Sequence, residues 1–213
     1  MCSFSFVGAD YTTKAPDGGN GSPGTKGSTG TAGTSGYNSS TCTYYCNTPP
    51  GNGGTGGQGT PGAAGSQGAK GLPAPPGRVQ LGIVTGAVTI CAGGGKGQDG
   101  GKGGRGGIGG PGGDPGAMDP QAKCTAASRG QQGRGGNGGN GGKSGDGGDG
   151  TTVIVTYTQI TGGSITPNTF SANPGTPGDP GSGGAGIPNG TDGSRGAVGS
   201  QGSSSNVIIR QEA

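Results

Sequence analysis

The residues that could carry chemistry in this sequence are few, and their types exclude most enzymes. Histidine is absent, which excludes histidine-based catalytic triads and most zinc sites. The single glutamate, Glu212, lies at the end of the chain. Segment 137–144 reads NGGNGGKS and ends like a phosphate-binding loop, but asparagine stands where that loop needs its first glycine. We therefore predict no catalytic activity, no metal site and no cofactor.

The composition is incompatible with a conventional apolar core. Of 213 residues, 62 are glycine, 24% are hydrophobic and none is tryptophan, so stability must come from backbone hydrogen bonds, close packing and cross-links. The net charge of +3 is scattered along the chain, which argues against nucleic acid as a partner. No stretch approaches the ~20 apolar residues of a membrane span, and the N-terminus lacks the pattern of a secretory signal. We expect no membrane insertion.

The elements that must position any functional residue are glycine-rich. In segment 130–150, glycine recurs at every third position, and a second glycine precedes most of these. Polyproline II is the backbone conformation with three residues per turn, and it forms no hydrogen bonds of its own. Two glycine columns leave two faces of such a helix without side chains, so that other backbones can approach and pair with it. We predict an interior rod of a bundle at 130–150.

Glycine-rich sequences also occur in collagen and in disordered chains. Collagen repeats glycine every third residue, but it needs only one glycine per triplet, and proline is too scarce here at 16 residues. A disordered low-complexity chain would also fit the composition.

Glycine runs and strand-like segments alternate along what we expect to be a single domain, 1–213. The glycine runs are 18–36, 53–77, 93–116, 130–150 and 175–202. The strand-like segments are 2–8, 79–91, 152–160, 165–171 and 206–211, with a bend or bulge near Gly86. The first run has one glycine column, which predicts a rod on the outside of the bundle.

If neighbouring rods alternate in direction, all strand-like segments gather at one end. The connectors 37–50 and 117–129, predicted to contain no strand, then lie at the other end, and the last run must fold back at about 183–189. The predicted fold is a bundle of antiparallel polyproline II (polyglycine II) helices with short β-strands forming a base at one end and almost no α-helix.

The cysteines fit this arrangement. Cys2 and Cys91 fall at the strand end, and Cys42, Cys46 and Cys124 fall at the connector end. Five is odd, so at most two disulfides form. We expect Cys124 to pair with either Cys42 or Cys46. The alternative is five reduced thiols in a protein that stays in a reducing compartment.

A rigid rod with irregular loops at one end is the layout of a display device, since loops on rigid scaffolds carry recognition. Connector 37–50 holds the only aromatic cluster, Tyr37, Tyr44 and Tyr45, and tyrosine offers a large contact area at low entropic cost. Connector 117–129 adds Asp119 and Lys123. We predict that these five residues bind a receptor. Alternatively, the tyrosines only shield the end of the bundle from water.

Two families share this pattern. Glycine runs that alternate with irregular segments, and runs that end in GGDGTTVIVTY and SSSNVIIRQ, resemble the tail-fibre tip adhesins of T-even-like phages and glycine-rich domains of phage tail and bacterial surface proteins. This resemblance implies a virion or extracellular location and a host surface receptor or fibre protein as partner. The aromatic-rich attachment domain of those adhesins has no counterpart here.

The GGN- and GGK-like repeats with cysteines are also similar to springtail antifreeze proteins, which are bundles of polyproline II helices. Ice binding requires a flat array of small residues, and the first run offers one column of them in Thr25, Ser28, Thr31 and Thr34. A third possibility is a filament subunit that assembles through the terminal strands, 3–7 and 206–211, because strand edges pair readily with further copies.

Overall fold

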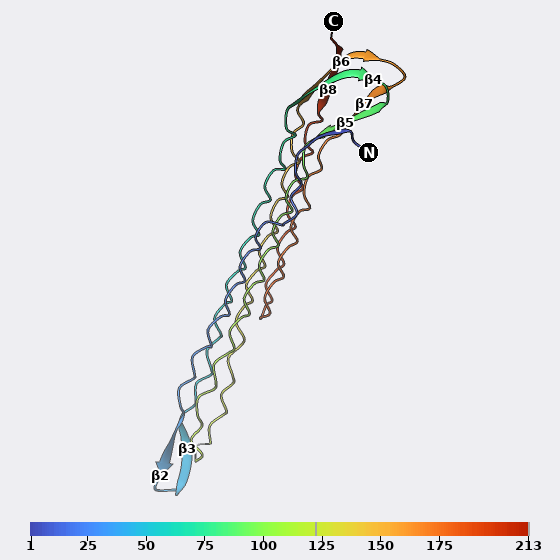
Figure 1. The fold of residues 1–213 in the computed structure, drawn as a ribbon. Coiled ribbons are helices and arrows are strands. Elements are labelled where there is room, and N and C mark those ends of the chain that lie inside the picture. Colours follow the sequence, from blue (N-terminus) through green and yellow to red (C-terminus); the bar gives the residue numbers. More distant parts are fainter. Residues whose placement is uncertain (122, 213) are drawn as a thin grey trace.

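The computed structural model describes residues 1–121 and 123–212, and in this part of the chain it contains strands but no helix. The strands are β1 (Phe4–Val7), β2 (Thr34–Asn38), β3 (Thr43–Thr48), β4 (Gly77–Val84), β5 (Ala87–Gly93), β6 (Thr152–Ile160), β7 (Ser164–Thr169) and β8 (Asn206–Gln211). Figure 1 shows a long bundle with β2 and β3 at one end, here called the tip, and the other strands at the opposite end, the base.

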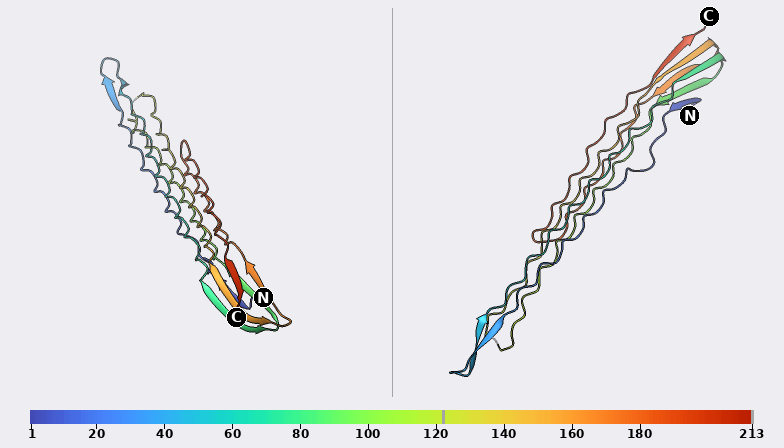
Figure 2. Two further views of the ribbon diagram at one scale, coloured as in Figure 1. Left: turned by 90° about the horizontal axis from the view of Figure 1, so that it is seen from above. Right: turned by 90° about the vertical axis from the view of Figure 1, so that its left-hand side faces the viewer.

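Extended segments that are neither helix nor strand run between base and tip, and we call them rods 1 to 6. Their residues are 8–33, 51–76, 94–116, 130–150, 171–186 and 189–205. Rods 1 to 4 reach the tip, whereas rods 5 and 6 turn at 186–188 and stop partway along the bundle (Figure 2). The predicted fold-back at 183–189 is therefore confirmed.

Backbone hydrogen bonds arrange the rods in two layers. Rods 1, 3 and 5 are parallel neighbours in one layer, with bonds such as Gly21 N–H to Arg105 O and Gly103 N–H to Asp179 O. Rods 2, 4 and 6 form the second layer in the same way. Between layers the pairing is antiparallel, as in Gly139 N–H to Gly104 O at 2.8 Å. These bonds recur at every third residue and satisfy the polar backbone without a sheet.

Each layer continues into a parallel sheet of the same order at the base. The layer of rods 1, 3 and 5 continues into the sheet β1-β5-β7, and the layer of rods 2, 4 and 6 continues into β4-β6-β8. The core between the sheets contains Val79, Ile90, Ala92, Val153 and Val155. The layers pair backbone to backbone where glycine fills the interface, and they separate into two sheets where valine and isoleucine replace it.

The number of glycine columns follows the number of neighbouring rods. Rods 3 and 4 each hydrogen-bond to four other rods, and both have the Gly-Gly-x repeat. Rod 1 bonds to two rods and has one glycine column. Rod 2 bonds to three rods, and it changes from Gly-Gly-x to Gly-x-y along its second column, which donates to rod 1 and includes Ala63 and Ser66. The interior position predicted for 130–150 agrees with these bonds.

Asparagine and aspartate side chains link parallel rods within each layer. Their side-chain oxygens accept hydrogen bonds from backbone N–H groups of the next rod. These N–H groups point outward and would otherwise face water. Examples are Asn20 Oδ1 with Arg105 N at 2.9 Å, Asn140 Oδ1 with Ser194 N at 2.9 Å, and Asp146 Oδ1 with Ser200 N at 2.8 Å. Asp17 and Asp99 do the same for Lys102 and Thr176.

These contacts lower the pKa of the carboxyl groups that make them. The main cause is the Lys14 ammonium at Asp17, the Thr176 N–H at Asp99 and the Ser200 N–H at Asp146. A group with a lowered folded-state pKa stabilises the fold above its unfolded pKa, and this stability is lost as the pH falls through the folded pKa.

We therefore expect the melting temperature to be constant above about pH 5 and to fall below about pH 4. The triple variant Asp17→Asn, Asp99→Asn, Asp146→Asn should show a weaker fall, because an amide oxygen still accepts the hydrogen bond but does not titrate. Thermal unfolding from pH 7 to pH 2 at constant ionic strength measures both. An equal fall in the variant would show that these carboxylates do not set the acid sensitivity.

Three predictions about local structure need correction. Connector 37–50 is not free of strands, because β2 and β3 form a hairpin there. Segment 79–91 is not one bent strand but β4 and β5 in different sheets, with a turn at Thr85 and Gly86. Rod 1 begins near Gly8 rather than Gly18, since Tyr11 N and Ala15 N already donate to rod 3.

Candidate functional site

The predicted receptor-binding residues lie on two neighbouring segments at the tip. The first is the antiparallel hairpin of β2 and β3, in which Tyr37 faces Tyr44 and Gly36 faces Tyr45. Threonine and tyrosine favour strands, and the loop 39–42 joins the two strands. Asn38 Oδ1 accepts from Ser40 N at 3.0 Å and closes the first turn of that loop. The threonines and tyrosines gathered in β3 are the signal that could have revealed this hairpin from the sequence.

The hairpin divides the three tyrosines between its two faces. Tyr37 and Tyr44 are cross-strand partners on one face, with ring centroids 5.0 Å apart and ring planes tilted by 52°. Tyr45 lies on the opposite face, where its ring covers Gly36 so closely that a side chain at Gly36 would collide with it. All three rings are exposed, by 53%, 40% and 50% for Tyr37, Tyr44 and Tyr45. The tyrosines are therefore not buried against the rod ends.

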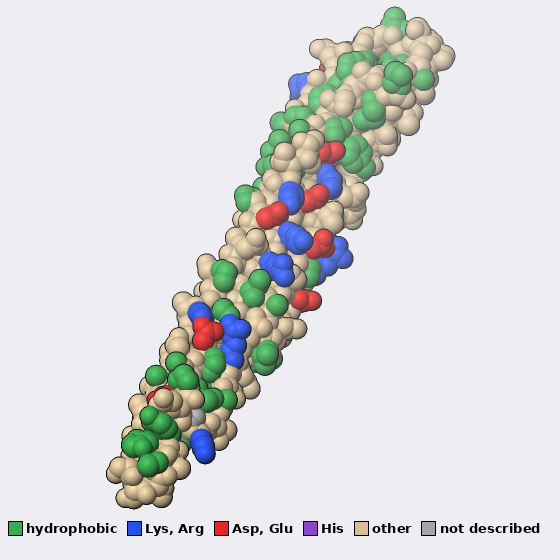
Figure 3. Space-filling view, turned by 90° about the horizontal axis from the view of Figure 1, so that it is seen from below, with side chains coloured by type: hydrophobic (Ala, Val, Ile, Leu, Met, Phe, Trp, Pro, Cys, Tyr) green, Lys and Arg blue, Asp and Glu red, His purple; other side chains and the backbone are tan. Residues whose placement is uncertain are grey.

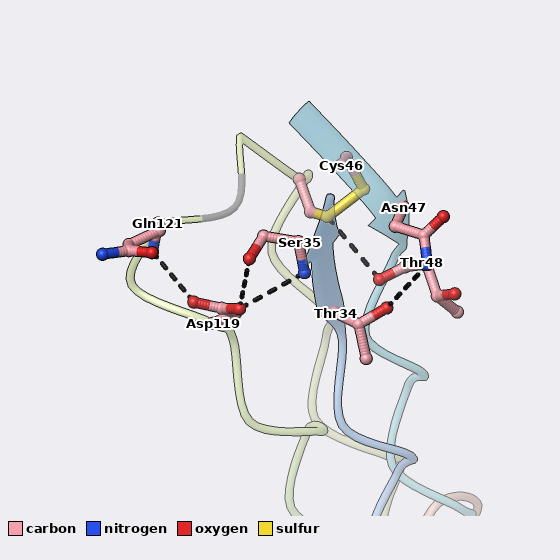
Figure 4. The surroundings of a disulfide bond; sticks show 8 residues. Thr34, Ser35, Cys46, Asn47, Thr48, Asp119 and Gln121 are labelled. Atoms are coloured by element: carbon pink, nitrogen blue, oxygen red, sulfur yellow. Dashed lines mark hydrogen bonds between the residues drawn. A yellow bond between two sulfur atoms is a disulfide. The ribbon is translucent and has the colours of Figure 1, made fainter. Parts of the chain in front are cut away.

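The second segment is the connector between rods 3 and 4, which is tied to the hairpin in two ways (Figure 4). Cys46 forms a disulfide with Cys124. Asp119 accepts hydrogen bonds from Ser35 Oγ at 2.5 Å and from Ser35 N at 3.2 Å. Ser35 and Cys46 are cross-strand partners, so the connector lies on the same face as the Tyr37–Tyr44 pair.

Asp119 acts as a structural link. The Ser35 hydroxyl, followed by the Gln121 N–H, lowers the pKa of its carboxyl group below the usual range. The carboxylate is therefore charged at neutral pH, and its oxygens are occupied by three donors. No sequence pattern indicated the Ser35–Asp119 link, because it joins residues 84 positions apart.

The remaining predicted residues have separate places. Cys42 is an exposed free thiol in the hairpin loop, so Cys46 rather than Cys42 pairs with Cys124. The second disulfide joins Cys2 to Cys91 at the base. Lys123 is exposed on the connector and forms no ion pair with any residue that the structure describes.

The rods carry shallow grooves and most of the charged side chains (Figure 3). One groove of about 340 Å³ lies beside Asp17, Asn20, Lys102 and Arg105, and another lies beside Arg129 and Gln132. Within 1–121 and 123–212, no three potential metal ligands lie together. No helix long and apolar enough to cross a membrane occurs in these residues.

Comparison with known proteins gives limited information. No protein-family model and no curated protein matches the chain. Among solved structures, the nine polyproline type II helical bundle antifreeze protein of the springtail Granisotoma rainieri is similar at 25% sequence identity. The match covers 93% of this chain and 98% of that chain, with a TM-score of 0.21. So low a TM-score carries no argument about fold or function.

Proposed function

We propose that this protein is a rigid display scaffold of polyproline II helices whose tip binds a receptor on another surface, as an adhesin does. Two facts support the conformation of the rods. Their hydrogen bonds recur every third residue, as at Gly136, Gly139 and Gly142, and their residues are neither helix nor strand. Three residues per turn and no internal hydrogen bonds are the properties of polyproline II.

The observation that carries the binding function is the exposed tyrosine pair on a hairpin cross-linked to a second loop. An isolated two-stranded hairpin is marginally stable in water. Here the Cys46–Cys124 disulfide and the Ser35–Asp119 hydrogen bonds fix it. Rings that are fixed before binding lose little entropy in a complex, and exposed tyrosines are frequent anchors of interfaces. Shielding the rod ends would require buried rings instead.

The labelled protein should bind intact cells of at least one type in a panel of bacteria and eukaryotic cells. We expect Tyr37→Ala with Tyr44→Ala to weaken this binding about tenfold or more, because the pair places two exposed aromatic rings side by side on one face of the hairpin. The matched control is Thr55→Ala with Gln58→Ala on rod 2. Flow cytometry measures the binding. Equal loss in both variants, or binding to no cell, would reject a tip receptor site.

A second candidate function, ice binding, is favoured by the edge where rods 1 and 2 meet. Ser22, Thr25, Ser28 and Thr31 form an exposed column there, whereas Thr34 already belongs to β2. The hydroxyl groups of Thr25, Ser28 and Thr31 lie over the glycines of rod 2, so the edge is smooth. Polyproline II would space these residues by roughly 9 Å. Thermal hysteresis of the purified protein tests this function. Hysteresis that is lost in Thr31→Lys but kept in the control Thr55→Lys would favour ice binding over receptor binding at the tip.

A further inference from the structure

Charged residues are absent from one long stretch of the chain. No aspartate, glutamate, lysine or arginine occurs between Lys26 and Lys70. This stretch forms the distal part of rod 1, the hairpin and most of rod 2. Its two ends are charge-paired to other rods, Lys26 with Asp114 and Lys70 with Asp149. The proposed receptor-binding hairpin thus lies in the middle of an uncharged stretch of chain, and the only charged groups beside it come from the connector 117–129 within the described residues.

The exposed groups of this hairpin are aromatic rings, hydroxyl groups and amides. The loop next to Tyr37 and Tyr44 exposes the hydroxyl residues Ser39, Ser40 and Thr41. Asn38, Thr43 and Asn47 are exposed as well, but they alternate onto the opposite face of the hairpin with Tyr45. Such groups donate and accept neutral hydrogen bonds in several directions. The tyrosine faces offer apolar area to ring C–H groups, while the phenol oxygens remain available as hydrogen-bond partners.

The nearest charged groups on the connector do not change this chemistry. The carboxylate of Asp119 accepts three hydrogen bonds from Ser35 and Gln121, so it has little remaining capacity to accept from a ligand. The connector contains two further charged residues, Lys123 and Arg129. Arg129 forms an ion pair with Asp114, with 3.4 Å between Nη2 and Oδ1. A single lysine point charge is a weak basis for selecting an acidic polymer, which arginine forks and clusters of cations recognise better.

We propose that the receptor bound by this hairpin is an uncharged carbohydrate, with a sugar ring against the Tyr37–Tyr44 pair and its hydroxyl groups on the Ser and Thr side chains of the adjoining loop. This inference rests on the proposed tip function. A protein receptor fits less well, because about a quarter of the residues of typical domains are charged. Interfaces with such surfaces usually contain complementary charges that steer association and fix the partner.

Surface plasmon resonance of the full chain against immobilised polysaccharides tests the ligand class. The neutral probes are mannan, galactan, β-glucan and chitin, and the acidic probes are alginate and hyaluronate. We expect binding to at least one neutral probe, weakened about tenfold by Tyr44→Ala. The matched control Thr55→Ala with Gln58→Ala changes exposed residues of rod 2, away from the tip, and should change the Kd less than twofold. Near-ultraviolet and far-ultraviolet spectra of both variants check the fold.

Three results would overturn the carbohydrate inference: no binding to any neutral probe, equal loss in Tyr44→Ala and in the rod 2 control, or binding to acidic probes alone that Lys123→Ala abolishes. Treatment of bound cells separates this inference from the proposed function. If protease removes tip-dependent cell binding and periodate does not, the receptor is a protein, so the tip function stands and the ligand class is wrong. If no cell binds in a tip-dependent way, the tip function itself fails.

Discussion

Replacing Gly139 with alanine is expected to lower the free energy of unfolding by about 3 kcal/mol or more. Gly139 is buried in rod 4, and its N–H donates to Gly104 O of rod 3 at 2.8 Å. A Cβ atom there would meet the Ala63 carbonyl group of rod 2 far closer than the 3.0 Å that real contacts respect. The obstacle is backbone held by its own ladder of hydrogen bonds, so no side chain can rotate away to relieve it.

The matched control is Gly19→Ala in rod 1. A Cβ atom at Gly19 would have no neighbour within 4 Å, and the residue is exposed. This variant should be neutral or slightly stabilising, because alanine reduces the conformational entropy of the unfolded chain. Chemical denaturation followed by far-ultraviolet circular dichroism compares the two. Similar stabilities would mean that rod 4 does not lie in the interior of the bundle.

Removing the base disulfide by Cys2→Ser with Cys91→Ser should cost about 4.5 kcal/mol in the chain-entropy description of cross-links. The large effect follows from the sequence separation of 89 residues, which the bond closes into one loop. The disulfide also holds β1, an edge strand, to its neighbour β5. Urea unfolding of the oxidised protein and of this double variant measures the difference.

Cys42→Ser is the control for that experiment. Cys42 is exposed and free, so its replacement should leave the urea midpoint unchanged. The tip disulfide, Cys46–Cys124, has a similar separation of 78 residues, and its removal should destabilise the chain to nearly the same extent. A base variant as stable as the Cys42→Ser control would show that the rod ladder alone restrains the ends of the chain.

The glycine columns made the rods predictable because they record how many backbones approach each rod. The Gly-Gly-x repeat of rods 3 and 4 marks the two rods with four partners. In rod 4 the second glycine column begins at Gly135. Its N–H donates to Pro188 O, in the turn that leads into rod 6, so the column begins where rod 6 comes alongside. Closer to the tip the same column contains Gln132 and Arg129. The periodicity therefore predicted the interior rod and the end at which the strands of the base lie, but not the hairpin at the tip.

The pairing of strands could not be predicted from such a pattern. All strand pairs of the base are parallel, because each sheet collects rods that run in the same direction. Alternation of apolar residues describes the faces of one strand and says nothing about its neighbours. The hairpin β2–β3 was missed for a related reason. Its strands bury little and show no alternation of apolar and polar residues, so the threonines and tyrosines of β3 are the one strand signal that they carry.

The candidate site was only partly accessible from sequence. The tyrosine cluster and the approach of Cys124 to Cys42 or Cys46 follow from the placement of the two connectors at one end. The choice of Cys46 depends on strand register, since Cys46 faces Ser35 on the side of the connector, whereas Cys42 lies in the loop. The division of the tyrosines between two faces depends on the same register, which no local pattern specified.

The ladder between antiparallel rods has a mechanical consequence. Its bonds, such as Gly142 N–H to Gly101 O and Gly107 N–H to Thr60 O, run across the bundle rather than along it. A pull on the tip along the long axis therefore loads many of these bonds in shear at once, whereas a sideways force would open them one after another. In the half of the bundle nearer the tip, rods 1 to 4 carry this load. In the half nearer the base, rods 5 and 6 carry part of it as well. The molecule is therefore expected to resist axial load more strongly than bending, and it thickens toward its base.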